Sequence, residues 1–182
     1  GIDAPPPPAS GPEAAPLFVH EQLRVVVDAD ALKWLARQDA WWERVPRGRL
    51  VLTPHPGELS ALSGRETEAI TADPAAVARA CAEAWGQTVV VKSGYAAVSD
   101  GSRTLVVDDA PYGLAKAGSG DVLAGSLAAF LAQGVAPVDA AGLALYLGAR
   151  AARRLEQEYG ALGIVATDMP EAIAREIGRL TS

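Results

Sequence analysis

The sequence has one cysteine and two histidines among 182 residues. Cys81 alone cannot form a disulfide within the chain, and so few cysteines and histidines argue against a dense Cys/His metal site. Cys81 lies among apolar residues in a helical pattern, so we interpret it as a small buried hydrophobic residue rather than a nucleophile.

Basic runs and long hydrophobic runs are also missing. The formal net charge is -6 and the pI about 4.9, so nothing indicates a surface that binds nucleic-acid phosphates. No stretch reaches the roughly 18 to 20 apolar residues that a membrane span needs, and the start of the chain has no signal-peptide pattern. We expect a cytoplasmic protein with neither nucleic acid nor membrane as a partner.

What is present is an ordinary globular composition, with 49% hydrophobic and 21% charged residues. The length favours one domain with a core of its own. Residues 4–16 are rich in Pro and Ala, so residues 1–22 are predicted to be a linker or an exposed loop. Residues 23–182 are predicted to form the folded domain.

Strand and helix patterns alternate along this domain. Apolar, β-branched runs predict strands within residues 23–30, 48–54, 87–94, 95–101 and 102–109, the last two as a hairpin. Helical patterns cover residues 31–45, 56–64, 73–86, 120–134, 137–160 and 167–180. The alternation predicts an α/β fold, a three-layer α/β/α sandwich around a mostly parallel sheet.

Two helix starts carry specific capping signals. Asp73 is predicted to be the N-cap of one helix, with Pro74 in its first turn and Gly86 at its C-terminal end. Asp30 is predicted to cap the helix that follows the first strand.

Four polar stretches follow the predicted strands or hairpin. In parallel sheets, ligands bind beyond the carboxyl ends of the strands. We therefore expect residues 28–30, 53–58, 92–96 and 117–121 to gather at one edge of the sheet.

The stretch before the helix at residues 120–134 resembles an anion site. Gly118 and Gly120 lack side chains, so a phosphate could approach the free N–H groups of the helix N-terminus. Asp121 would repel a phosphate, but it fits a group that takes a proton from an attacking hydroxyl. The alternative is a glycine turn in which Ser119 is a cap and Asp121 a first-turn acid.

The other stretches each allow two interpretations. Glu58 could hold a water molecule of a phosphate-bound Mg²⁺, and His55 could bind a polar substrate group, or they could be a first-turn acid and an exposed loop histidine. Lys92 could neutralise a nucleotide phosphate or be a solvated lysine at a strand end. Asp28 could order the site or a hydrated cation.

The order of these motifs is recognisable. The sequence contains, in this order, "VVVDADAL", "LTPHPGELSAL", "VVVKSGYAAVSD", "GLAKAGSGDVLAGSLAAFLAQG" and "GIVATDMPEAI". This pattern resembles the ADP-dependent NAD(P)H-hydrate dehydratase family, which has the ribokinase-like fold. The resemblance covers about residues 23–180, and the combination of "HPGE" with "AGSGDVLAG" is its most specific part.

The resemblance implies a repair reaction. Members of the family use ADP, or ATP in eukaryotes, together with Mg²⁺ to phosphorylate the hydroxyl group of hydrated NADH or NADPH. Phosphate then leaves, and the reduced cofactor is restored. The partners implied are hydrated NAD(P)H and an adenine nucleotide. Members of the family often form homo-oligomers, so the resemblance implies a homo-oligomer here as well.

The resemblance also assigns site residues. Asp121 resembles the catalytic acid near the substrate hydroxyl, and His55 the histidine that contacts substrate. Glu58 would lie near the metal and phosphates. The residues implied to bind nucleotide are Lys92, Ser93, Gly94, Tyr95, Ala96, Gly118, Ser119 and Gly120.

One departure from the family is large. The glycine-rich substrate region and "GPGLG"-like turn that usually begin this domain are missing. We therefore expect the chain to be the C-terminal part of a ribokinase-like domain, with an incomplete sheet. Two alternatives stay open: a ribokinase-like kinase for a thiamine or pyridoxal precursor, and an inactive nucleotide-binding fragment.

Overall fold

Five strands and the helices around them form three layers in the computed structural model, which describes residues 23–108, 111, 114 and 117–181. The strands are β1 (Val25–Val27), β2 (Leu50–Leu52), β3 (Thr88–Val91), β4 (Ala96–Ser99) and β5 (Thr104–Val107). The helices are α1 (Asp30–Leu35), α2 (Pro56–Ser63), α3 (Thr67–Ala72), α4 (Pro74–Trp85), α5 (Ser119–Ala132), α6 (Pro137–Tyr159) and α7 (Met169–Thr181). Two short 3₁₀ helices are η2 (Trp41–Arg44) and η4 (Ala166–Asp168).

The sheet has the strand order β1-β2-β3-β4-β5. The first three strands are parallel, and β4 and β5 form the expected antiparallel hairpin, with Ser99 opposite Thr104. The carboxyl ends of β1, β2 and β3 therefore point to the same edge of the sheet. The predicted α/β/α architecture is confirmed, with a mixed sheet.

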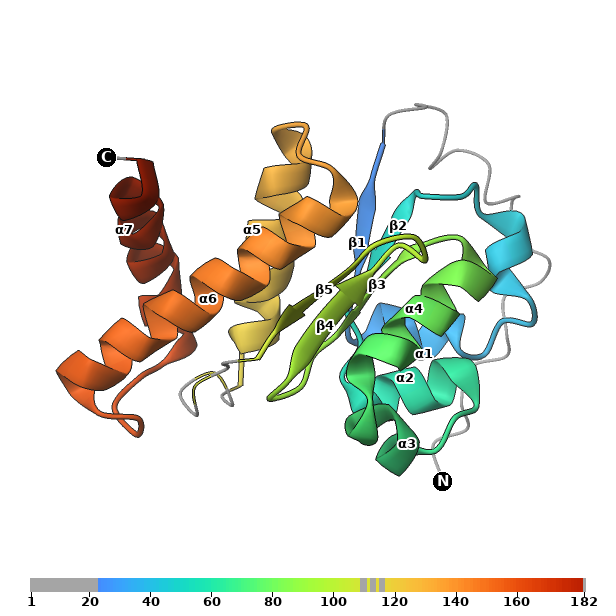
Figure 1. Ribbon diagram of the computed structural model, residues 1–182, viewed down its shortest axis with the longest axis horizontal. Helices are drawn as coiled ribbons and strands as arrows, with labels where there is room; N and C mark the ends of the chain where they lie inside the picture. Colours follow the sequence, from blue (N-terminus) through green and yellow to red (C-terminus); the bar gives the residue numbers. More distant parts are fainter. Residues whose placement is uncertain (1–22, 109–110, 112–113, 115–116, 182) are drawn as a thin grey trace, which may run out of the picture.

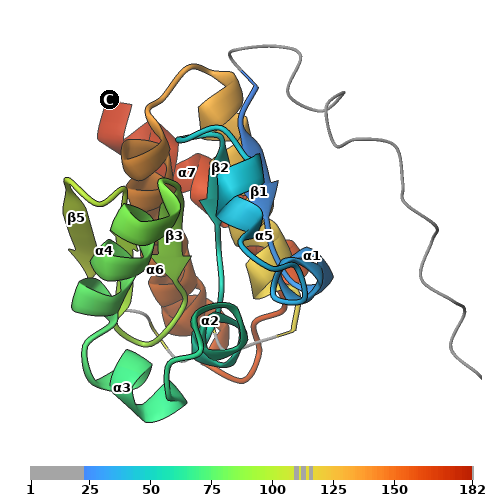
Figure 2. The same cartoon turned by 90° about the vertical axis from the view of Figure 1, so that its right-hand side faces the viewer.

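Helices cover both faces of the sheet (Figure 1). On one face, α1, α2 and α4 pack their apolar side chains against β1–β3, and on the other face α5 and α6 do so. Figure 2 shows α4 in front of β3 and α6 behind it. Alternate strand residues serve the two layers, because Val89 and Val91 lie in one core cluster and Val90 in the other.

The capping signals had different outcomes. Asp73 accepts a hydrogen bond from the amide of Ala76 at 2.9 Å, and Gly86 ends α4 with a φ of 65°, so that prediction is confirmed. The prediction for Asp30 was wrong. Ala29 occupies the N-cap of α1, and Asp30 is an exposed first-turn residue that hydrogen-bonds Lys33 instead.

The helix predicted over residues 31–45 is confirmed only in its first part, as α1. The segment leaves the helical path after Leu35 and reaches a left-handed conformation at Ala40, with a φ of 44°. This break lets Trp41 turn into the core, where its ring lies 5.4 Å from that of Trp85. Burial of a large indole outweighs the local preference of the segment for helix. Three of the four tryptophans thus pack together. Helix α3 has no counterpart among the predicted helices.

A buried carboxylate joins the last two helices. Glu176 of α7 is fully buried and accepts hydrogen bonds from Arg150 and Arg154 of α6 and from Arg179 of its own helix. Burial alone would raise the pKa of Glu176, but the three arginines outweigh it and lower the pKa to about 2. The carboxylate therefore stays ionised and holds α7 onto α6.

Replacing Glu176 with Gln is expected to lower the free energy of unfolding by about 2 kcal/mol near neutral pH, because three guanidinium groups lose their charged partner. The pKa is lower in the folded chain than its usual 4.5, so the stabilisation is complete above about pH 4.5 and lost as the pH falls toward about 2. Urea unfolding at about pH 7 and about pH 3 should show the difference between the two proteins shrinking at the lower pH. Glu171→Gln, at an exposed carboxylate of α7, is the control and should cost under about 0.5 kcal/mol. An equal loss at both pH values would contradict this role.

Among the described residues, no helix is both long and apolar enough to cross a membrane. The predicted linker, residues 1–22, lies outside the described residues.

Candidate active site

Three strand ends and one helix start meet at one edge of the sheet. Asp28 follows β1 and Lys92 follows β3, and Asp28 Oδ1 lies 2.5 Å from Lys92 Nζ. The segment after β2 lies between them, since Lys92 donates its amide to the carbonyl of Pro54 at 2.9 Å. The first turn of α5 adjoins this pair: a Cβ on Gly120 would lie 3.4 Å from Asp28 Oδ2. The predicted gathering of the four polar stretches is confirmed.

His55 and Glu58 form a reciprocal cap at the start of α2. His55 Nδ1 accepts hydrogen bonds from the amides of Gly57 and Glu58, at 3.0 and 3.2 Å, and Glu58 Oε2 accepts one from the amide of His55 at 2.9 Å. These partners assign the proton of the neutral ring to Nε2, which lies 3.6 Å from Glu58 Oε1. Glu58 is buried, whereas the His55 side chain is 56% exposed. The capping interpretation thus applies to both residues, and the outer edge of the imidazole remains accessible.

The loop before α5 needs glycine at residue 118. Gly118 is the N-cap of α5 with a φ of 87°, and a Cβ there would lie 2.9 Å from the Cβ of Ala166. Ser119 is the first residue of the helix rather than its cap, which corrects that alternative. Asp121 is exposed in the first turn of α5, where its charge interacts favourably with the helix dipole.

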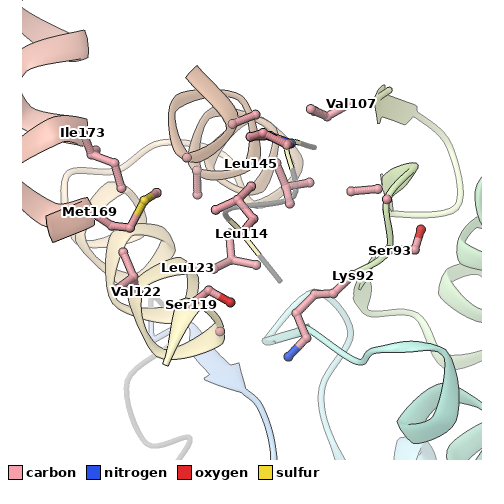
Figure 3. A pocket seen from close by; sticks show the side chains of 17 residues that line it. Lys92, Ser93, Val107, Leu114, Ser119, Val122, Leu123, Leu145, Met169 and Ile173 are labelled. Carbon is pink, nitrogen blue, oxygen red and sulfur yellow. The ribbon is translucent and has the colours of Figure 1, made fainter. Parts of the chain in front are cut away.

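A cavity of about 620 Å³ opens beside this helix start. At one end lie Lys92 of the β3–β4 loop and Ser119 of α5 (Figure 3). The rest of the lining is mainly apolar and comes chiefly from β5, α5, α6 and α7, with Leu114 from the segment between β5 and α5. Its members are Val107, Leu114, Val122, Leu123, Ala144, Leu145, Gly148, Ala149, Met169 and Ile173, with Pro111 beside them. The cavity is therefore apolar with one polar end, the usual character of a small-molecule site.

The structure separates the predicted site residues into two groups. Those that line the cavity are Lys92, Ser93, Gly94, Ala96, Ser119 and Gly120. Those that do not line it are His55, Glu58, Tyr95, Gly118 and Asp121. Tyr95 is half-exposed, and Ala96 is buried at the start of β4. Most of the residues predicted to bind nucleotide thus line the cavity, whereas His55 and Asp121, predicted to act on substrate, do not.

Sequence reasoning missed the apolar wall of the cavity. Leu145 and Gly148 of α6 and Met169 and Ile173 of α7 form much of it. Their spacing on amphipathic helices is the same as that of residues packed in a core, so no local signal distinguishes them. The pairing of Asp28 with Lys92 has no local signal either, because the two residues lie 64 positions apart in the sequence.

The described residues do not form a metal cage by themselves. No group of three or more His, Cys, Asp or Glu side chains among them is arranged to hold an ion. Mg²⁺ usually needs only one or two carboxylates when substrate phosphates supply further ligands. Glu58, largely buried beside Lys92, fits that smaller requirement.

Comparison with known proteins places this geometry in a family. The family model described as NAD(P)H-hydrate dehydratase matches residues 10–175. An ADP-dependent (S)-NAD(P)H-hydrate dehydratase of Neisseria meningitidis is 37% identical over 95% of this chain, and the chain spans 60% of that relative. A bifunctional NAD(P)H-hydrate repair enzyme of Pyrobaculum aerophilum is 37% identical over 85% of this chain and 30% of its own length.

A solved structure agrees with the sequence relatives. The ADP/ATP-dependent NAD(P)H-hydrate dehydratase of Bacillus subtilis, co-crystallised with ATP and Mg²⁺ and soaked with CoA, superposes with a TM-score of 0.76 at 26% identity. The match covers 86% of this chain and 56% of that one. The motif order, the layered fold and the family match over most of the chain agree, and the chain belongs to the NAD(P)H-hydrate dehydratase family.

Proposed function

We propose that this chain carries the nucleotide-binding and catalytic part of an NAD(P)H-hydrate dehydratase, which uses ADP or ATP to restore NADH or NADPH from its hydrated form. The observation that carries the proposal is the cavity, because its apolar body ends at Lys92 and the first turn of α5. An adenine ring fits the apolar part, and phosphates fit the end that has a cation and the positive N-terminus of a helix. The names of the family relatives point to the same reaction.

Asp121 is the group proposed to act on the substrate hydroxyl. It lies in the same turn of α5 as Ser119 and Gly120, which line the phosphate end of the cavity. A hydroxyl beside Asp121 would give up its proton to the carboxylate as its oxygen bonds to phosphorus and the nucleotide departs. The carbon–oxygen bond then breaks, phosphate leaves with the electron pair, and loss of a ring proton forms the double bond of the reduced nicotinamide.

Mg²⁺ is proposed to arrive with the nucleotide. Glu58 would hold it through water, and the ion would neutralise charge on the transferred phosphate. We also propose that the protein is cytoplasmic and that it forms a homo-oligomer, the latter on the basis of the family resemblance. Light scattering on the purified protein would test the oligomeric state.

The proposed function is tested by mixing the purified protein with hydrated NADH, Mg²⁺ and ADP and following the absorbance of the reduced nicotinamide. Recovery that requires ADP and releases free phosphate supports the dehydratase. Accumulation of a stable phosphorylated product, with small alcohols as substrates, would instead identify a kinase of the ribokinase-like type. ADP binding without any turnover would show that the chain is an inactive nucleotide-binding fragment.

His55 offers a way to separate capping from substrate binding. Asn is among the best N-cap residues, so His55→Asn should keep the stability of the wild-type protein within about 0.5 kcal/mol, whereas His55→Ala should lose about 1 kcal/mol. Both variants lack the exposed imidazole edge, so both should raise the KM for the hydrated cofactor by about 10-fold. Thermal unfolding and steady-state kinetics measure the two effects. An Asn variant with wild-type KM would mean that His55 serves only as a cap.

A further inference from the structure

We propose that Asp28 is a positioning residue, whose carboxylate holds the Lys92 ammonium group at the first turn of α5 so that it faces the phosphates of a bound nucleotide. The inference rests on the proposed use of an adenine nucleotide. It concerns a residue outside the set that the motifs assign to nucleotide or substrate.

The contact between the two side chains is close and sheltered. Asp28 Oδ1 lies 2.5 Å from Lys92 Nζ, and the two side chains are only 15% and 20% exposed. Glu58 Oε2 lies 3.9 Å from the same ammonium group and is 7% exposed. A partly buried lysine with a carboxylate in direct contact loses the rotamer freedom that a solvated lysine at a strand end would keep.

The pair adjoins the polar end of the cavity. A Cβ on Gly120 would lie 3.4 Å from Asp28 Oδ2 and 3.6 Å from Lys92 Nζ, so the two charged groups lie against the backbone of the first turn. Lys92 and Gly120 both line the cavity, whereas Asp28 does not. Asp28 can therefore act on a ligand in the cavity chiefly through Lys92.

The carboxylate of Asp28 adds negative charge to a site proposed to bind phosphate. Asp28 and Glu58 bring two negative charges to Lys92, which alone would make a poor phosphate site. A second carboxylate beside an anion site weakens binding unless it fixes the cation in place. The favourable effect of Asp28 on phosphate binding should therefore vanish or change sign when Lys92 is absent.

A double-mutant cycle on ligand affinity tests this role. The proteins are wild type, Asp28→Asn, Lys92→Met and the double variant, and calorimetry measures the dissociation constants of ADP and of adenosine. Asp28→Asn should weaken ADP binding by about 5-fold when Lys92 is present, because the ammonium group is no longer held. With Met at residue 92, Asp28→Asn should leave ADP binding unchanged or make it tighter, because only repulsion of the phosphate is removed.

Adenosine and a second carboxylate supply the controls. Adenosine lacks phosphate, so its affinity should be the same in all four proteins. A general loss of structure would instead weaken the binding of adenosine as well. Asp30→Asn makes the same charge change two residues away, at an exposed residue that pairs with Lys33, and should not alter ADP affinity. If Asp28→Asn fails to fold, Asp28→Glu replaces it in the cycle and should retain tighter ADP binding than Lys92→Met.

The outcomes separate this inference from the proposed reaction. An effect of Asp28→Asn that has the same size and direction in both backgrounds would overturn it, as would tighter ADP binding by the single variant. Absence of ADP binding by the wild-type protein would overturn it too. Loss or reversal of the Asp28→Asn effect in the Lys92→Met background, in a protein that does not dehydrate hydrated NADH, would support the role of Asp28 and refute only the dehydratase function.

Discussion

Replacing Asp121 with Asn is expected to reduce the recovery of NADH from its hydrated form by about 100-fold or more, because the amide cannot accept the proton of the attacking hydroxyl. Asp121 is exposed in the first turn of α5, so the substitution should cost only about 0.5 kcal/mol of stability through the helix dipole. ADP affinity should stay within about 3-fold of wild type, because Asp121 does not line the cavity. The loss should therefore appear in kcat rather than in nucleotide binding.

A matched control lies in the next helix. Asp139 is an exposed first-turn acid of α6 that pairs with Arg103, and Asp139→Asn should retain full activity. Retention of more than about a tenth of the activity by Asp121→Asn would show that another group takes the proton. Parallel loss of ADP binding would show that Asp121 supports the nucleotide site rather than the chemistry.

Replacing Gly148 with Phe is expected to weaken ADP binding by about 100-fold or more, because the new ring would occupy the apolar part of the cavity. Gly148 lies on α6 and lines the cavity, and a Cβ there would meet no atom within 4 Å. The backbone therefore accepts the side chain without a clash. Removal of a glycine from a helix interior also favours folding, so the melting temperature without nucleotide should not fall.

Gly178→Phe is the control for this prediction. Gly178 lies in α7, is exposed, has no atom within 4 Å of an added Cβ, and does not line the cavity. Its variant should show the same rise in melting temperature with ADP as the wild-type protein. If Gly148→Phe also kept that rise, the nucleotide would bind somewhere other than this cavity.

Local rules accounted for the elements whose ends carry a clear signal. The helix from Pro74 to Trp85 has an Asp at its N-cap and a left-handed Gly at its C-terminal end, and both act as predicted. The gathering of Asp28, Pro54 and Lys92 also followed from the sequence, because the carboxyl ends of adjacent parallel strands share one edge. Such inferences need only the chain near each residue and the direction of the strands.

The wrong predictions concern segments whose conformation depends on more than their local sequence. The helix expected over residues 31–45 breaks because Trp41 gains more from packing on Trp85 than the segment gains from helix. Asp30 was expected as the N-cap of α1, but Ala29 occupies that position one residue earlier, with a positive φ of 50°. Neither outcome has a local signal in the sequence.

The sequence by itself determined the order of motifs, the layered α/β/α architecture and the family, because periodicity, caps and short motifs are properties of neighbouring residues. Only the tertiary structure decided which side chains form the site. Asp28 and Lys92 are 64 residues apart, and the cavity wall joins Val107 of β5 to Leu145 of α6 and Ile173 of α7. Those contacts depend on how the layers pack against one another, and packing is set by the shapes of all the buried side chains together rather than by any one stretch of the chain.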